Sequence, residues 1–288
     1  METWFWVLVW FLSIITMTGN GFIIFLVCSR RHLRTKTNAF IVSLGVADFC
    51  VGMNVVPSLF FLELIGQSHS KGLDKGLKVV RWLFQDASAM NMCILVLDRY
   101  IAVVKPLKYL TFMTSTRVIQ LISFSWVVTV GIILVESSLL FTSKGKLVLI
   151  WLIIVLFFFL PSVMIVFCCT SMFRVVYMQN RTANVLGRKL CFYRRREKSA
   201  LIMMAIVTVL LPIYCGSYIR CVFINIWNDQ CNAFNYSVPM LILNSAVNPL
   251  AYAFFKRDIK NEIKAFFSFM TLRRDKVERF RKAGLVGP

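Results

Sequence analysis

Two carboxyl groups lie inside stretches of the sequence that are otherwise apolar. Asp48 is the only charged residue of residues 39–62, and Asp86 stands alone in the same way in a later apolar stretch. A carboxylate cannot stay ionised against lipid, so Asp48 must face the interior of a helix bundle and find donors or a cation there. Asn244 and Asn248, four residues apart, share a helix face. We predict that this face is the partner of Asp48.

These side chains need apolar elements to position them. A helix crosses the hydrocarbon layer of a membrane with about 20 mostly apolar residues. Seven stretches of the chain fit this requirement: 3–29, 39–62, 82–97, 118–135, 147–169, 199–219 and 230–255. We therefore predict an all-α fold, a single bundle of seven transmembrane helices, with the two termini on opposite sides of the membrane.

The composition points to a membrane protein and excludes other classes. Of the 288 residues, 58% are hydrophobic and 16% are charged, whereas about a quarter of the residues of a soluble domain are charged. This argues against a soluble enzyme, a disordered chain and a disulfide-stapled secreted module. The only histidines, His32 and His69, fall in predicted loops on opposite sides of the membrane. No catalytic constellation is present, and we expect no enzyme.

The basic residues predict the orientation. The segments 29–38, 98–117, 174–198 and 256–288 carry 26 of the 33 Lys and Arg residues, which leaves 7 for the other side. Short cytoplasmic loops are enriched in Lys and Arg. The N-terminus is therefore predicted outside the cell and the C-terminus in the cytoplasm, with the chain in the cell membrane. Anionic lipids of the inner leaflet are the expected partners of this charge, and nucleic acid is a poor one.

Short motifs within the predicted spans carry a family resemblance. They are Leu44-Gly45-Val46-Ala47-Asp48 in span two, Asp98-Arg99-Tyr100 at the end of span three, Pro212 in span six and Asn248-Pro249-Leu250-Ala251-Tyr252 in span seven. With these motifs in this order, the chain resembles a rhodopsin-like (class A) G-protein-coupled receptor along nearly its whole length. The resemblance implies a seven-transmembrane helix bundle with a short amphipathic eighth helix after Phe255.

The resemblance also implies two internal sites. A sodium-binding site maps onto Asp48, Ser88, Asn244, Ser245 and Asn248. Such oxygen ligands suit a hard cation, and the alternative is a water-filled polar network without an ion. G-protein coupling and the activation switch map onto Asp98, Arg99, Tyr100, Leu107, Pro212 and Tyr252. Arg99 can pair with Asp98 while the bundle is closed. In the family, the arginine turns toward the G protein when span six swings outward about its proline.

A ligand pocket is expected in the outer half of the bundle. The residues expected there are Glu63, Arg81, Gln85, Asp86, Glu136, Tyr214 and Tyr218. In amine receptors of this family an Asp on span three pairs with the ligand's ammonium, and the matching position here is Arg81. Arg81 could hold an anionic group of a small-molecule or peptide ligand. The alternative, that Arg81 pairs internally with Glu63 or Glu136, stays open at this point.

The chain departs from the family on the extracellular side. The family's cysteine at the outer end of span three is Asp74 here, and the short loop at 142–147 lacks the partner cysteine. Melanocortin-like and some lysolipid receptors also lack these cysteines, and the short loop is similar to that of the melanocortin-like receptors. Cys221 and Cys231 could form a bridge on the oxidising side or remain free thiols. Asn235, in an Asn-Tyr-Ser sequon, is a candidate for glycosylation.

The C-terminal segment has no cysteine for a lipid anchor, since none follows Cys231. We expect the eighth helix to be held at the membrane surface by Phe266, Phe267, Phe269, Lys260 and Lys264. We divide the chain into a receptor domain at 1–270, which includes this helix, and a short basic cytoplasmic tail at 271–288.

The predicted function is a receptor that binds an extracellular ligand and activates a heterotrimeric G protein. One alternative is a receptor-like protein with weak or ligand-independent signalling, because the family's switch tryptophan on span six is Leu210 and its span-five tyrosine is Cys169. Another is an ion- or proton-coupled transporter, which would also bury Asp48, Asp86 and Glu136. Transporters more often show internal repeats, and none is visible in this sequence.

Overall fold

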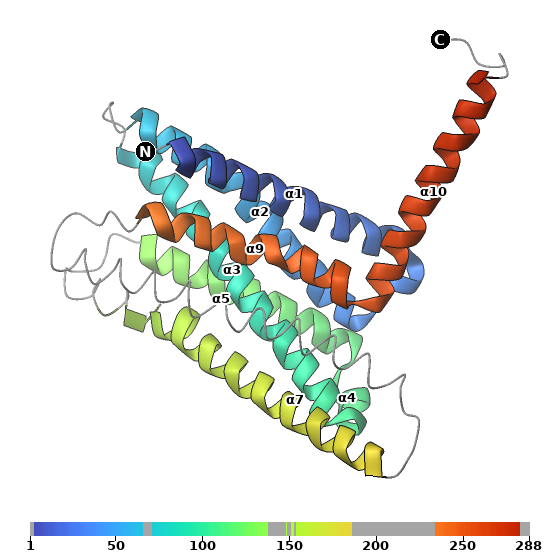
Figure 1. Ribbon diagram of the computed structural model, residues 1–288. Helices are drawn as coiled ribbons and strands as arrows, with labels where there is room; N and C mark the ends of the chain where they lie inside the picture. Colours follow the sequence, from blue (N-terminus) through green and yellow to red (C-terminus); the bar gives the residue numbers. More distant parts are fainter. Residues whose placement is uncertain are drawn as a thin grey trace.

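The computed structural model describes residues 3–65, 71–137, 148, 151–152, 154–185 and 234–282. Within these residues all regular structure is helical (Figure 1). The long helices are α1 (Thr3–Ser29), α2 (Lys36–Ile65), α3 (Lys71–Val104), α5 (Ser115–Ser137), α7 (Leu160–Val185), α9 (Phe234–Phe255) and α10 (Arg257–Lys282). The short elements are η1 (Arg31–Leu33), α4 (Pro106–Phe112) and the π-helical turn η2 (Ile154–Phe159), which runs into α7.

Six of the described helices are long and apolar enough to cross a membrane. Their apolar parts are Thr3–Ser29, Lys36–Phe60, Val79–Val104, Ser115–Val135, Leu160–Met178 and Val238–Phe255. They correspond to the predicted spans one to five and seven, while the predicted sixth span at 199–219 lies outside the described residues. Large apolar side chains such as Phe11, Val127 and Leu134 are exposed on these helices, as lipid-facing side chains must be.

The central helix of the arrangement is α3. In Figure 1 it crosses the bundle obliquely, with α1, α2 and α9 on one side and α5 and α7 on the other. It packs against α2, α5 and α7, while α1 packs against α2 and α9. Polar side chains on α3 are therefore within reach of most of the other described spans.

The starts of two spans are fixed by threonine caps. Thr35 precedes α2, and its Oγ1 accepts a hydrogen bond from the Asn38 backbone N at 3.3 Å. Thr114 precedes α5 and accepts from the Arg117 N at 3.3 Å. Each hydroxyl satisfies one of the backbone donors that the first turn of a helix leaves unpaired.

Small residues let α1 lie close to its neighbours. A methyl group at Gly52 of α2 would come within 3.1 Å of the Ser13 backbone oxygen, and one at Gly19 of α1 within 2.7 Å of Pro249 Cγ. Transmembrane helices associate through such close packing because lipid supplies no hydrophobic drive between them. These glycines bring α2 and α9 against α1.

The buried apolar side chains form two clusters, named after the predicted orientation. The outer cluster lies toward the N-terminal end of α1, and the inner cluster lies toward its C-terminal end. The outer cluster includes Val51 and Ile242, and the inner cluster includes Leu44 and Tyr252. Asp48 lies on α2 between Leu44 and Val51, so the two apolar clusters close off its carboxylate from either end of the bundle.

The described helices cover more of the chain than the sequence predicts. Residues 106–112 form α4 within a segment expected to be a loop, because Pro106 stands at the favoured first position of a helix. α7 continues to Val185, past the expected end at 169. α10 continues past 270 to Lys282, so the expected tail at 271–288 is largely helical. No Gly or Pro interrupts residues 162–185 or 257–282.

In Figure 1, α10 turns sharply away from α9 and passes the inner end of α1. Ile259 is buried in the inner cluster, and Phe266 packs edge-on against Phe22 of α1, with ring centroids 5.5 Å apart. Phe267 also contacts Phe22, whereas Phe269 is exposed. α10 is thus the expected eighth helix, and aromatic contacts hold its first turns to α1.

Candidate functional site

The centre of the bundle holds Asp48 in a fully buried position. Ser88 Oγ of α3 donates to Asp48 Oδ1 at 2.6 Å, and Asn248 Nδ2 of α9 donates to Asp48 Oδ2 at 2.7 Å. The Ser245 hydroxyl also lies beside the carboxylate. Asn20 of α1 donates to the Ser245 backbone oxygen at 3.1 Å. Four helices therefore meet around one carboxylate.

The oxygen atoms around Asp48 suit a hard cation. Asn244 Oδ1 is buried and has no hydrogen-bond partner among the described residues. An unsatisfied buried acceptor is costly, and a cation or ordered water would satisfy it. The residues present, with carboxylate, amide and hydroxyl oxygens, fit the ligand preference of sodium. Ser88, Ser245 and Asn248 thus lie around Asp48, and Asn244 stands one helical turn from Asn248 on α9. That these residues bind sodium stays a prediction.

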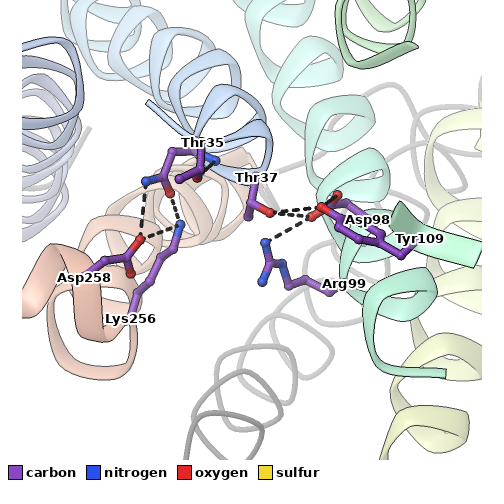
Figure 2. A network of polar contacts seen from close by, with 8 residues as sticks. Thr35, Thr37, Asp98, Arg99, Tyr109, Lys256 and Asp258 are labelled. Atoms are coloured by element: carbon purple, nitrogen blue, oxygen red, sulfur yellow. Dashed lines mark hydrogen bonds and ion pairs between the residues drawn. The ribbon is translucent and has the colours of Figure 1, made fainter. Parts of the chain in front are cut away.

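The inner end of α3 holds a second buried carboxylate. Asp98 Oδ2 lies 3.1 Å from Arg99 Nη2 and accepts a hydrogen bond from Thr37 Oγ1 of α2 at 3.1 Å. Tyr109 Oη of α4 donates to Asp98 Oδ1 at 2.9 Å. Figure 2 shows these side chains converging from three helices. The Asp98–Arg99 pair was expected, but Thr37 and Tyr109 were not.

The phenol of Tyr109 is a donor in this cluster. Burial raises the pKa of Tyr109, and the negative charge of Asp98 raises it further. The phenol therefore keeps its proton. Leu107, on the same short helix, is 82% exposed. α4 thus presents an apolar side chain outward while its tyrosine secures the neighbouring carboxylate.

A further polar cluster joins the start of α2 to the start of α10 (Figure 2). Lys256 Nζ donates to Asn38 Oδ1 and lies 3.7 Å from Asp258 Oδ2. Asn38 Nδ2 donates to the Leu33 backbone oxygen at 2.6 Å and to Asp258 Oδ2 at 3.4 Å. Burial lowers the pKa of Lys256 to about 8, although the charge of Asp258 opposes this shift.

Glu262 of α10 extends this contact. Its carboxylate lies 3.3 Å from Arg30 Nε and 3.1 Å from His32 Nε2. Asp258 and Glu262 are four residues apart and share a helix face. One acidic face of α10 therefore lies against the basic segment that follows α1. The Arg30 and His32 side chains are more than half exposed, so each of these contacts adds little stability by itself.

The outer half of α3 buries three polar side chains that were expected to line a ligand pocket. Arg81, Gln85 and Asp86 are 6%, 3% and 5% exposed. Gln85 Oε1 has no hydrogen-bond partner among the described residues. A buried cation and an unsatisfied acceptor therefore stand one helical turn apart on α3.

Other predicted site residues cannot be placed. Pro212, Tyr214, Tyr218, Cys221 and Cys231 lie outside the described residues. Glu63, Glu136 and Asn235 fall on α2, α5 and α9 at positions where only the backbone is described. The pocket mouth, the Cys221–Cys231 bridge and the glycosylation site therefore stay predictions.

The sequence contained partial signals for the residues that were missed. Asp258 and Glu262 at a spacing of four indicate an acidic helix face. Asn38 follows a threonine cap by three residues, yet its role depends on Lys256, 218 residues later. Nothing in the local sequence of Thr37 or Tyr109 indicates that both would reach Asp98.

Comparison with known proteins gives consistent matches. A sequence profile described as "7 transmembrane receptor (rhodopsin family)" matches residues 19–252. The chain is 26% identical over 276 residues to the histamine H2 receptor of Cavia porcellus, covering 89% of this chain and 77% of that protein. It is 38% identical over 120 residues to dopamine receptor 2 of Drosophila melanogaster, covering 40% of this chain and 22% of that protein.

The fold is similar to that of squid rhodopsin. The TM-score is 0.75 at 18% sequence identity, and the match covers 92% of this chain and 85% of the rhodopsin chain. The predicted all-α, seven-helix architecture is thereby confirmed. The similarity to melanocortin-like receptors in the short loop and the missing cysteines stays a prediction.

Proposed function

The chain belongs to the rhodopsin family of seven-transmembrane receptors, and on that premise we propose that it passes an extracellular signal to a heterotrimeric G protein. The family resemblance predicted from the motifs is confirmed, and the protein is a multi-pass membrane receptor. The single observation that supports G-protein coupling is the Asp98–Arg99 pair, 3.1 Å apart at the inner end of α3.

The proposed mechanism is a shift between closed and open bundles. In the closed bundle Arg99 is paired with the buried Asp98, whose other partners come from α2 and α4. Outward movement of the sixth span about Pro212 would open the cytoplasmic side and let Arg99 and the exposed Leu107 contact the G protein. A ligand drives this shift only by binding the open bundle more tightly than the closed one.

We propose that the ligand carries an anionic group. The relatives are named for histamine and dopamine, which are protonated amines at neutral pH. The buried cation at Arg81 would repel such a ligand at this position, whereas a guanidinium forms strong paired hydrogen bonds with carboxylate or phosphate. This charge separates the chain from the amine receptors that it otherwise resembles.

We also propose that Asp48, Ser88, Asn244, Ser245 and Asn248 hold a sodium ion. The ion would supply the positive charge that a buried carboxylate otherwise lacks. The chain's own part is to gather oxygen atoms from α2, α3 and α9 around that charge, and the two hydrogen bonds to Asp48 keep its carboxylate aimed at them.

The proposed orientation places the N-terminus outside the cell and the C-terminus in the cytoplasm. The concentration of Lys and Arg in four segments supports it, as does the position of Arg99 and the basic α10 at one end of the bundle. The test is antibody labelling of intact cells that express the chain with an epitope tag at either end. Only the N-terminal tag should be labelled.

Coupling is tested by nucleotide exchange on purified heterotrimeric G protein with the full chain in lipid nanodiscs. The expected result is basal exchange that falls in Arg99→Ala and persists in the control Arg117→Ala, whose guanidinium stacks on Phe112 instead. Equal exchange by the parent chain and Arg99→Ala would reject coupling through this arginine. Ion flux through vesicles without exchange would favour a transporter.

A further inference from the structure

The outer end of α3 carries a regular series of cations. α3 is one continuous helix from Lys71 to Val104, and its membrane-spanning part begins at Val79, so about two turns project beyond it. Lysines occupy positions 71, 75 and 78 of this projection, and Arg81 follows within the span. Spacings of four, three and three residues place these positions on one side of the helix.

This side of α3 faces the interior of the bundle. Arg81 and Gln85, which continue the series inward, are buried. Gly76 and Val80 fall on the opposite side and are exposed, and no atom lies within 4 Å of the place a Gly76 Cβ would occupy. At 3.6 residues per turn, positions 71, 75, 78, 81 and 85 stay within about a third of the helix circumference. We call these five positions the α3 stripe.

The α3 stripe is electropositive. It holds four basic residues, against Asp74 on the same side and the buried Asp86 at its edge. A line of like charges beside low-dielectric walls concentrates the field and raises the local concentration of the opposite ion. Three of these positions precede the apolar span, and the fourth, Arg81, is buried in the bundle.

The inner end of the α3 stripe also contains a buried hydrogen-bond acceptor without a donor among the described residues. Gln85 Oε1 is buried and unsatisfied among the described residues, which is unusual unless a bound group completes it. It lies one turn deeper than Arg81. The two side chains together match a molecule with an anionic group and, further in, a hydroxyl or N–H group.

We infer that the α3 stripe draws an organic anion from the extracellular water to Arg81, and that this anion is the receptor's ligand. The chemical class is a carboxylate, sulfate or phosphate with a hydrogen-bond donor that reaches Gln85. The inference rests on the proposed function in taking the outer half of the bundle as the ligand site. Entry from water follows because the lysines project beyond the apolar span.

The experiment measures the electrostatic potential along α3 in the intact chain without requiring a ligand. A cysteine reporter is placed on the α3 stripe side by Trp82→Cys, and a matched reporter on the opposite side by Gly76→Cys. Each cysteine is reacted with two charged methanethiosulfonates, the anionic 2-sulfonatoethyl and the cationic 2-(trimethylammonium)ethyl reagent. The neutral methyl methanethiosulfonate gives the rate that corrects for different accessibility of the two cysteines. The unsubstituted chain gives the background from its native cysteines.

The expected ratio of anionic to cationic reaction rates is about tenfold higher at position 82 than at position 76, and the difference shrinks in 1 M salt. The variant Lys71→Gln/Lys75→Gln/Lys78→Gln should remove most of the difference in rate ratio between positions 82 and 76. The matched cytoplasmic variant Lys105→Gln/Lys260→Gln/Lys264→Gln should leave this difference unchanged. Equal ratios at the two positions, a ratio favouring the cation, or no reaction at position 82 would overturn the inference.

Competition distinguishes the source of the anion. Millimolar phenyl phosphate should slow labelling at position 82, whereas phenyltrimethylammonium should not. Protection by lysophosphatidic acid vesicles alone would overturn entry from water, and protection by neither anion would overturn the binding site. These measurements need no G protein. A chain that fails to stimulate exchange can therefore still pass them, and the proposed function and this inference fail separately.

Discussion

Tyr109 Oη donates to Asp98 Oδ1 over 2.9 Å, and this bond ties the short helix α4 to the inner end of α3. The same carboxylate holds Arg99, so α4 is linked through Asp98 to the residue expected to couple to the G protein. Because Asp98 is fully buried, each donor around it offsets part of the cost of removing its charge from water.

Substitution of Tyr109 by phenylalanine should weaken this arrangement. Tyr109→Phe removes a hydrogen bond to a charged group, so we expect a loss of about 1.5–3 kcal/mol in the free energy of unfolding and higher basal nucleotide exchange. Thermal unfolding and exchange assays measure the two effects. The exposed tyrosine of α7 provides the control, Tyr177→Phe, which should change neither. Unchanged exchange in Tyr109→Phe would show that Asp98 does not need this donor to restrain Arg99.

Sodium should stabilise the receptor through Asp48. Replacing choline chloride by sodium chloride at constant ionic strength should add about 1.4 kcal/mol at a concentration ten times the Kd. Asp48→Asn should abolish this increment, because the amide cannot neutralise the ion. Asp258→Asn, outside the spans, should retain it. An equal stabilisation by sodium of the parent chain and of Asp48→Asn would show that sodium does not act through Asp48.

Lys256 should make stability depend on alkaline pH. Its pKa is lowered from 10.5 to about 8 in the folded chain, mainly by burial. Below about pH 8 the lysine is charged in both the folded and the unfolded chain, and the folded chain bears the full free-energy cost of burying this charge. Between about pH 8 and 10.5 the unfolded chain holds a proton that the folded chain has released, so stability rises with pH.

The comparison that isolates this effect is with Lys256→Met. Relative to this variant, the parent chain should gain up to about 3 kcal/mol as the pH rises from 8 to 10.5. Other lysines and tyrosines titrate equally in both proteins and cancel in the difference. Asp258, Asp98 and Arg99 also act on Lys256, so Asp258→Asn should lower its pKa further. A constant difference across this pH range would contradict the prediction.

Two glycines should respond oppositely to alanine. A Cβ at Gly19 would meet Pro249 Cγ at 2.7 Å, so Gly19→Ala must push α1 from α9 and should cost about 1–3 kcal/mol. Gly131 of α5 has no atom within 4 Å of a Cβ, and Gly131→Ala should stabilise the helix by up to about 1 kcal/mol. Thermal unfolding measures both. Similar shifts in the two variants would show that α1 and α9 are not closely packed.

Much of this receptor follows from local sequence. Spans are set by runs of about 20 apolar residues because the bilayer has a fixed thickness, and six predicted spans coincide with described helices. The pairing of Asp48 with Asn248 followed from two facts, the cost of a charge in lipid and the spacing of two asparagines. The family motifs then identified Arg99 as the switch, a role that still awaits measurement.

Helix lengths were less well predicted. α7 and α10 continue beyond their apolar or amphipathic cores because no glycine or proline stops them, and a helix can extend into water where charged side chains are satisfied. The hydropathy of residues 174–185 and 271–282 gave no sign of this. No glycine or proline breaks a helix in these segments, but an assignment based on apolar spans places such polar segments in loops.

The sequence by itself determined where the chain is buried in lipid and which polar residues must turn inward, because both depend on hydropathy and helical period. Only the tertiary structure decided which inward residues meet. Thr37 reaches Asp98 and Asn38 reaches Lys256 because α2 packs across α3 and against α9, the helix that Lys256 follows. Such crossings bring together residues 61 and 218 positions apart, a distance over which no local pattern carries information.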